Sequence, residues 1–203
     1  FWTVNALLKK DKTEIKASLA TYKNKKFVPK NKEEVDELLQ KIKNKDFLIK
    51  EIKKAKTKSH APAPFTTSTM QQEASRKLRY TGQRTMRTAQ QLYEGVEIPV
   101  HGVTGLITYM RTDSLRISEE ARAAANKYIA NTFGEKYLPA KPNVYRSKKD
   151  AQDAHEAIRP IDIRRTPESL ANVLEKNQYK LYKLIYDRFI ASQMAEAQYD
   201  SVS

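Results

Sequence analysis

The sequence predicts an α+β protein, with strand-like segments at both ends of the chain and helices in the middle. Apolar residues alternate along residues 2–8, which is typical of a half-buried strand. In the middle of the chain they recur at the three- and four-residue intervals of a helix. Pro62 and Pro64 separate the two patterns. We therefore expect two domains, a β-rich domain from residues 1–61 and 192–203, and a mainly helical, winged-helix-like domain from residues 62–191.

The N-terminal elements follow from local patterns. Residues 2–8 and 15–19 alternate on either side of a charged turn, which predicts a hairpin. Asn31, with an acid three residues later, is typical of a helix start, and the apolar spacing continues to about Lys43. Residues 47–52 resemble a further strand, followed by an extended linker.

The helical domain begins with a capping-box pattern at Ser68–Gln71, which predicts a helix to about Tyr80 that stops at Gly82. A second helix is expected over residues 84–94, ending at Gly95. Two short helices around a glycine-containing turn resemble a helix-turn-helix, although this spacing alone is only weakly diagnostic of DNA binding.

A short buried strand is expected around Tyr109. Ser118, followed by two glutamates, predicts a helix that ends near Gly134. Thr166 and the proline after it predict another helix start. A last helix is expected over residues 178–194 before the chain returns to a strand, which should pair with the sheet of the N-terminal part.

Composition excludes some classes of protein. The 203 residues include no cysteine, which excludes disulfides and thiolate metal ligands. No apolar run approaches the ~18 residues of a transmembrane helix, and no signal-peptide pattern is present. These features fit a cytoplasmic protein with no membrane partner. The first residue is Phe1, and we expect the chain to be an excised piece of a larger protein.

The net charge of +14 favours a nucleic-acid partner, because basic proteins are attracted to phosphate backbones. Residues 1–60 hold 17 lysines, no arginine and 8 acids, whereas residues 61–203 hold 9 lysines, 12 arginines and 16 acids. The lysine runs have a simpler interpretation as a solvated face. Arginine, in contrast, suits bidentate contacts to phosphate, and all the arginines lie in the helical domain.

Tyr109 and Arg111 form the most informative local pattern. On a strand, side chains two residues apart share a face, so a hydroxyl nucleophile would lie beside a guanidinium that suits phosphate. This pairing fits attack on a phosphodiester. The alternative is a purely structural Tyr109, since tyrosine is a good strand former.

Three ordered motifs resemble those of the type IA DNA topoisomerases, and of bacterial DNA topoisomerase I in particular. The first is Pro64-Phe65-Thr66-Thr67-Ser68-Thr69-Met70-Gln71-Gln72-Glu73-Ala74. The second is Gly105-Leu106-Ile107-Thr108-Tyr109-Met110-Arg111-Thr112-Asp113-Ser114. The third is Asp153-Ala154-His155-Glu156-Ala157-Ile158-Arg159-Pro160. The resemblance is strongest over residues 62–193, and it implies that the β-rich ends belong to the sheet domain that arches over the DNA gate of the family.

The resemblance implies an ATP-independent isomerase that relaxes negative supercoils. In such an enzyme Tyr109 attacks one DNA strand and holds its 5′ phosphate, a second strand passes, and the break is resealed. Arg111 would hold the scissile phosphate, and His155 would lie near the tyrosine and contact phosphate. A histidine is otherwise more often a satisfied core residue.

Other residues of the motifs are candidate DNA contacts with local alternatives. Asp113 could orient Arg111 through a salt bridge or cap the following turn. Arg159 could reach DNA or, as we favour, pair with Glu156. Four further polar residues at a helix N-terminus could bind phosphate or only cap the helix, namely Thr66, Ser68, Thr69 and Gln72.

The acidic cluster that holds Mg²⁺ in this family has no counterpart in the sequence, and no residue here is predicted to bind metal. We therefore expect an inactive fragment whose partners are single-stranded DNA and the rest of the same polypeptide, in a bacterial, nucleoid-associated enzyme. The alternative is a non-catalytic helix-turn-helix module that binds DNA. Another type IA member, such as topoisomerase III or reverse gyrase, would share the same chemistry.

Overall fold

The computed structural model describes residues 2–145 and 155–203. Two compact units are present. One contains the chain up to Lys54 together with Val202 and Ser203, and the other extends from Ala55 to Ser201.

The N-terminal unit begins with the expected hairpin. β1 (Asn5–Lys10) pairs antiparallel with β2 (Thr13–Ser18), and Leu8 lies opposite Ile15. The turn between them places Asp11 at a φ of 52°. A second, shorter hairpin follows, formed by β3 (Thr21–Tyr22) and β4 (Lys25–Lys26).

The helix α1 (Lys32–Ile42) confirms the predicted cap, because the Asn31 side chain accepts a hydrogen bond from the Glu34 backbone N–H at 2.9 Å. Val35 and Leu38 form its buried face.

The strand expected over residues 47–52 is wrong. Its apolar side chains are exposed, and the strand β5 (Lys54–Ser59) forms after it instead. β5 pairs with the C-terminal strand β8 (Ala197–Val202). The position of this strand is therefore set by its hydrogen-bonding partner and not by the apolar residues that precede it.

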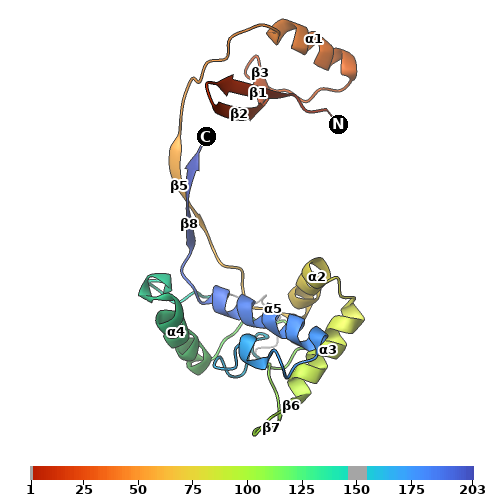
Figure 1. Ribbon diagram of the computed structural model, residues 1–203, viewed down its shortest axis with the longest axis vertical. Helices are drawn as coiled ribbons and strands as arrows, with labels where there is room; N and C mark the ends of the chain where they lie inside the picture. The colour runs from red at the N-terminus through yellow and green to blue at the C-terminus, as the bar shows by residue number, and fades with distance from the viewer. Residues whose placement is uncertain (1, 146–154) are drawn as a thin grey trace. The chain divides into compact units, whose positions relative to one another are not determined.

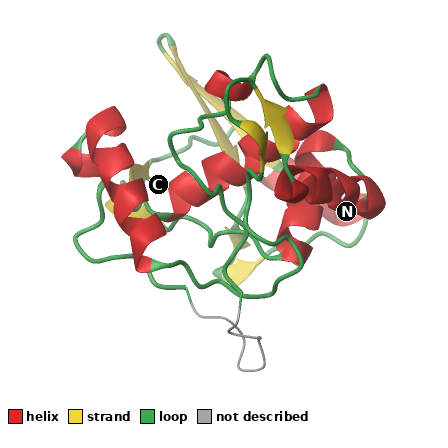
Figure 2. Ribbon diagram, turned by 90° about the horizontal axis from the view of Figure 1, so that it is seen from below, coloured by secondary structure: helices red, strands yellow, loops and turns green. Residues whose placement is uncertain are grey.

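The unit from Ala55 to Ser201 is mainly helical (Figures 1 and 2). Its helices are α2 (Thr67–Leu78), α3 (Gly82–Glu94), α4 (Glu119–Phe133) and α5 (Lys176–Ser192). Its short elements are the hairpin of β6 (Val96–Ile98) and β7 (Gly102–Thr104), and the 3₁₀ turns η1 (Glu135–Tyr137) and η2 (Glu168–Leu170).

The helix α5 is the centre of the core of this unit, with α4 on one side and α2 and α3 on the other (Figure 1). Its inward face carries Leu181, Ile185 and Phe189, spaced four residues apart and all at most 2% exposed. Phe65, Met70, Leu106, Ile107 and Ile158 complete the same core. All three sequence motifs thus contribute side chains to the core.

Several helix boundaries differ from those predicted. The N-cap of α2 is Thr66 rather than Ser68. The helix ends at Leu78, and its C-cap, Arg79, adopts a left-handed conformation with φ of 59°. Gly82 does not stop a helix but is the first residue of α3, capped by Thr81. The start predicted at Thr166 leads only to the short turn η2. The cap at Ser118 and the end of α4 at Gly134 are confirmed.

Backbone hydrogen bonds join the three motifs. The Ile158 N–H donates to the Phe65 carbonyl at 2.8 Å, and the Ile161 N–H donates to the Leu106 carbonyl at 3.0 Å. The Thr108 N–H donates to the Arg159 carbonyl at 2.9 Å. Asp153 and Ala154 of the third motif lie outside the described residues.

Candidate functional site

Tyr109 does not lie on a strand. The residues around it form an irregular loop. Its β-type pairing is an isolated antiparallel bridge between Ile107 and Pro160. The predicted strand is therefore wrong. The argument that Tyr109 and Arg111 share the face of a strand does not apply to this loop, and their joint action on one phosphate stays a prediction. The loop is held in place by hydrogen bonds to residues 157–161 and to Thr67 of α2, and not by pairing with a neighbouring strand.

The Tyr109 ring is half-buried between two other rings. Its centroid lies 5.4 Å from that of Tyr93, on the last turn of α3, with the rings edge to face at 62°. On another side it lies 5.1 Å from the ring of His155. Ring contacts of this kind fix the orientation of an aromatic side chain. The structure thus brings together the predicted nucleophile and the predicted histidine.

Gly105 allows the Tyr109 loop to approach α3. A β-carbon at this position would lie 2.8 Å from the Tyr93 carbonyl oxygen, which is closer than real contacts allow. The next residue, Leu106, donates its N–H to the carbonyl of Leu92 at 2.8 Å. The loop is therefore fastened to the end of the helix that carries Tyr93.

Thr67 fastens the other side of the loop to the first turn of α2. Its hydroxyl donates to the Met110 carbonyl at 2.7 Å, with the Thr112 carbonyl 3.1 Å away, and accepts from the Thr112 N–H at 2.9 Å. The Thr67 N–H also donates to the Thr112 carbonyl at 2.8 Å. One threonine thus fixes the backbone on both sides of Arg111.

Arg111 is exposed and borders an open depression of about 520 Å³ on α3. The other lining residues are Gln83, Met86, Arg87, Gln90, Gln91 and Glu94. Within the described part of the chain, Arg111 has no carboxylate partner. Its guanidinium is therefore available to an anionic ligand.

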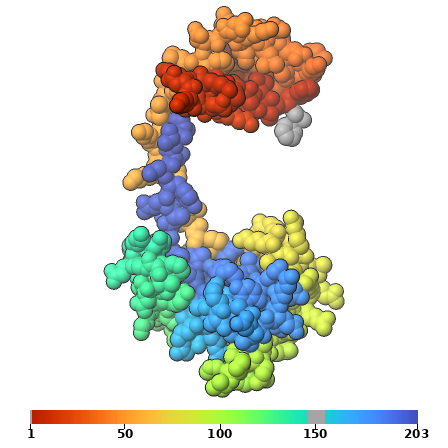
Figure 3. All heavy atoms as spheres, in the orientation of Figure 1, coloured from red at the N-terminus to blue at the C-terminus, as the bar shows by residue number. Residues whose placement is uncertain are grey.

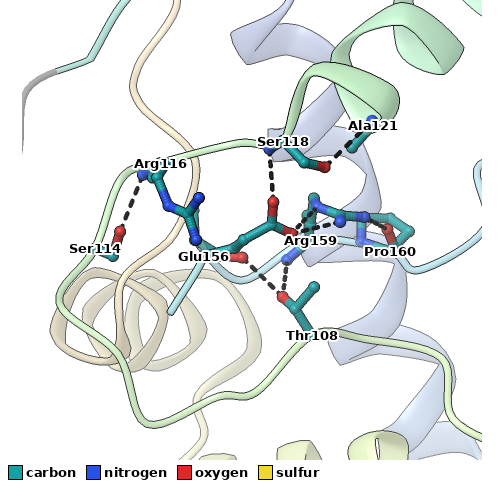
Figure 4. A network of polar contacts seen from close by, with 9 residues as sticks. Thr108, Ser114, Arg116, Ser118, Ala121, Glu156, Arg159 and Pro160 are labelled. Carbon is teal, nitrogen blue, oxygen red and sulfur yellow. Dashed lines mark hydrogen bonds and ion pairs between the residues drawn. The ribbon is translucent and has the colours of Figure 1, made fainter. Parts of the chain in front are cut away.

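Glu156 holds the segment that follows His155 (Figure 4). Its carboxylate accepts from the Ser118 N–H at 2.6 Å and pairs with Arg159, whose Nε lies 3.0 Å away. Burial acts to raise the pKa of Glu156, but the hydrogen bonds from Arg159 and Ser118 outweigh it, so the pKa lies below its ordinary value. The favoured pairing of Arg159 with Glu156 is confirmed. Contact of Arg159 with DNA stays a prediction.

Asp113 takes neither of its two expected roles. It is exposed, and among the described residues its carboxylate forms no ion pair with Arg111. Neighbouring hydroxyls stabilise the turn instead, since Thr112 accepts from the Ser114 N–H at 3.1 Å and Ser114 accepts from the Arg116 N–H at 3.1 Å.

The hydroxyls at the start of α2 bond to one another. The Thr66 N–H donates to the Thr69 hydroxyl at 2.9 Å, and the Thr66 hydroxyl accepts from the Thr69 N–H at 3.4 Å, which forms a capping box. Ser68 lies 3.2 Å from the Thr66 hydroxyl, and Gln72 is exposed. The local capping role is confirmed, and phosphate binding by these residues stays a prediction.

Sequence reasoning did not identify Tyr93 or Thr67 as parts of the site. Nothing in the local sequence of Tyr93 distinguishes it from other tyrosines at a helix end, because its role depends on where the Tyr109 loop packs. Among residues 2–145 and 155–203, no group of three or more His, Asp or Glu side chains is placed to hold a metal ion. No helix within those ranges is long and apolar enough to cross a membrane.

Tyr109 thus packs against a histidine and lies in the same loop as Arg111, an arginine with no carboxylate partner among the described residues. A family model described as DNA topoisomerase matches residues 1–203, so the chain belongs to the bacterial type IA DNA topoisomerase family.

A crystal structure of full-length topoisomerase I from Thermotoga maritima is similar to this chain, with 41% identity and a TM-score of 0.74. The match covers 92% of this chain and 29% of the T. maritima chain. The chain thus corresponds to under a third of that protein.

Proposed function

We propose that this chain is the part of a type IA topoisomerase that carries the attacking tyrosine. The observation that carries the proposal is the position of the Tyr109 ring, 5.1 Å from His155 in a loop that also presents the exposed Arg111. Family membership supports the proposal, because the three motifs meet at this loop.

In the proposed reaction, the Tyr109 oxygen attacks the phosphorus of a DNA phosphodiester. The bond from phosphorus to the 3′ oxygen breaks, and the phenolic proton is transferred to the leaving oxygen. The 5′ phosphate remains on Tyr109. Attack by the same 3′ hydroxyl reverses the step, so the reaction conserves the bond energy and needs no ATP.

Arg111 and His155 would act on the phosphate rather than on the tyrosine alone. A planar guanidinium can donate two parallel hydrogen bonds to phosphoryl oxygens and stabilise the charge of the transition state. An imidazolium could donate to a phosphoryl oxygen or supply a proton to the leaving group. Both side chains are on the loop or on the segment bonded to it.

The remainder of the enzyme would come from other parts of the polypeptide. We propose that the metal is held by a separate acidic domain and that this chain alone does not relax DNA. The proposal is supported by the described residues, among which no group of three or more His, Asp or Glu side chains gathers. The α2–α3 pair with the β6–β7 hairpin would form a winged-helix-like domain. The enzyme would act on single-stranded segments of the bacterial nucleoid.

A relaxation assay tests the division of the catalytic apparatus. The 203-residue chain should not relax supercoiled plasmid with or without Mg²⁺, whereas a longer polypeptide that includes the acidic domain should do so. Relaxation by the chain alone would contradict the division. If the longer polypeptide binds DNA but never relaxes it, the non-catalytic DNA-binding module becomes the better account.

A further inference from the structure

Arginines of the described residues fall into two groups. Six have a carboxylate within ion-pair distance, namely Arg76, Arg122, Arg159, Arg164, Arg165 and Arg188. Five have no carboxylate partner among residues 2–145 and 155–203, namely Arg79, Arg84, Arg87, Arg111 and Arg116. Four of these five belong to α3, to the turn that precedes it, or to the Tyr109 loop that borders it. Uncompensated positive charge thus collects around one helix.

Two adjoining depressions form a groove along α3. The first, which Arg111 borders, has a volume of about 520 Å³. The second, of about 290 Å³, is lined by Arg84, Arg87, Thr88, Gln91, Glu175 and Asn177. Both include Arg87 and Gln91, so we call the continuous surface the α3 groove. The space-filling view shows the residues of α2 and α3, yellow to yellow-green, at the surface of their unit (Figure 3).

Arg84 is held in place without being neutralised. Its guanidinium lies over the Tyr80 ring, 4.3 Å from the centroid, and its Nη2 donates to the Asn177 side chain at 2.6 Å. The Tyr80 hydroxyl also lies 3.2 Å from that side-chain oxygen. A stacked arginine with an amide partner keeps its full charge and loses little further freedom when it binds phosphate.

Arg79 occupies a backbone conformation that favours glycine. Its φ of 59° ends α2 in the left-handed region, where a β-carbon is disfavoured. A strained residue of this kind is a reason to look for a function of its side chain. The position places an exposed arginine on the turn that leads into α3.

The acidic residues of the groove are already engaged. Glu94 accepts a hydrogen bond from Gln90 at 2.6 Å, and Glu175 forms the capping box at the start of α5 with Gln178. At the Tyr109 end of α3, Tyr93 is 39% exposed and presents a ring that a base could stack on. Charge on one side and an aromatic ring at the end are features of surfaces that bind single strands.

We propose that the α3 groove binds the phosphate backbone of a single DNA strand through Arg84 and Arg87 and directs that strand to Arg111 and Tyr109. Arg79, on the turn before α3, would add a further phosphate contact outside the groove. This inference rests on the proposed function, because it assumes that the strand to be cut is DNA. It adds the surface on which that strand lies.

Binding of a fluorescent single-stranded oligonucleotide to the 203-residue chain tests the groove. The variant Arg84→Gln/Arg87→Gln is compared with Arg122→Gln/Arg164→Gln, which removes the same charge from arginines that already have carboxylate partners. We expect the groove variant to lose roughly a hundredfold in affinity, as for two charge-assisted contacts. The plot of log affinity against log salt should become less steep by about 1.4. The control should change far less in both.

Arg79→Gly provides a second, independent measurement. Glycine relieves the left-handed strain, so the melting temperature should rise while the affinity for the oligonucleotide falls. A rise in both would overturn a role for Arg79.

Equal losses in the groove and control variants would overturn the groove, because net charge alone would then explain binding. Absence of salt-dependent binding by the wild-type chain would overturn it as well. The proposed function is measured separately by covalent capture of DNA by the longer polypeptide. If the groove variant binds the oligonucleotide as tightly as the wild type, the groove proposal is wrong. If the longer polypeptide still captures DNA covalently in that case, the proposed role of Tyr109 is unaffected.

Discussion

The ring of His155 lies 5.1 Å from the ring of Tyr109, although the two residues belong to motifs far apart in the sequence. The contact is fixed by the backbone, since the Thr108 N–H donates to the Arg159 carbonyl at 2.9 Å and the Thr108 hydroxyl donates to the Ala157 carbonyl at 2.7 Å. The two side chains to which we assign the attack and a proton transfer thus lie together in the chain itself.

Replacing His155 with glutamine should give a partial defect in DNA cleavage. Glutamine keeps a hydrogen-bond donor but cannot carry a charge, so the cleavage rate should fall moderately. His101→Gln, at an exposed position outside the site, is the control. A cleavage rate in His155→Gln equal to that of the wild type would leave the histidine with a packing role only.

Arg111→Lys should reduce cleavage by orders of magnitude without abolishing it. Lysine preserves the positive charge but cannot form the two parallel hydrogen bonds of a guanidinium. Single-turnover cleavage of an oligonucleotide by the longer polypeptide measures the effect, with Arg164→Lys as the control. If Arg111→Lys cleaves as fast as the wild type, Arg111 does not clamp the phosphate.

Thr67→Val should destabilise the helical unit by about 1–3 kcal/mol, the cost of leaving buried backbone groups without partners. Valine has the shape of threonine, but it removes the hydroxyl that bonds to Met110 and Thr112. Thr67→Ser, which keeps the hydroxyl, is the matched control. Urea unfolding measures both, and equal stability of the two variants would show that the hydroxyl is dispensable.

Stability of the helical unit should fall in acid. The pKa values of Glu73 and Glu156 lie below the ordinary 4.5, and that of Asp162 lies below 3.8. A hydrogen bond from Lys77 is the largest cause of the lowered pKa of Glu73, and one from Arg164 is the largest cause for Asp162. Burial raises the pKa of Glu156, but the hydrogen bonds from Arg159 and Ser118 lower it by more. Groups with lowered pKa values stabilise the fold above their unfolded values, and this stabilisation is lost as the pH falls through the folded values.

Melting temperatures between pH 7 and pH 2.5 test this dependence. We expect little change down to about the ordinary carboxyl pKa of 4.5 and a steep fall below it. Glu156→Gln should flatten part of the fall because it removes one of the titrating groups. Stability that rises on acidification would contradict the ion pairs described.

Local sequence signals predicted the caps of α1 and α4 because a cap depends on residues within one turn. Local sequence signals gave wrong predictions where the position of a strand or the end of a helix depends on contacts with distant residues. The apolar pattern of residues 47–52 favoured a strand, but the pairing partner β8 lies opposite the lysine-rich β5. Arg79 in a left-handed conformation could not be foreseen, since glycine three residues later was the better local candidate for a helix end.

At the site, the three motifs identified Tyr109, Arg111 and His155, and the structure brings His155 to Tyr109. The strand on which the argument from spacing relied is absent, because the loop obtains its hydrogen bonds from Thr67 and from residues 157–161 instead. Tyr93 and Thr67 depend on contacts between separate segments, which no local pattern encodes.

Covalent capture of DNA tests most directly whether Tyr109 becomes joined to the strand that is cut. Labelled single-stranded DNA is incubated with the longer polypeptide, denatured, and separated on a gel, and Tyr109→Phe is compared with Tyr199→Phe, which changes an exposed tyrosine on β8. We expect the wild type and Tyr199→Phe to retain label on the protein. Tyr109→Phe should bind DNA under native conditions but retain no label after denaturation, because only the attacking oxygen is lost. Label that remains on Tyr109→Phe would remove Tyr109 from the mechanism.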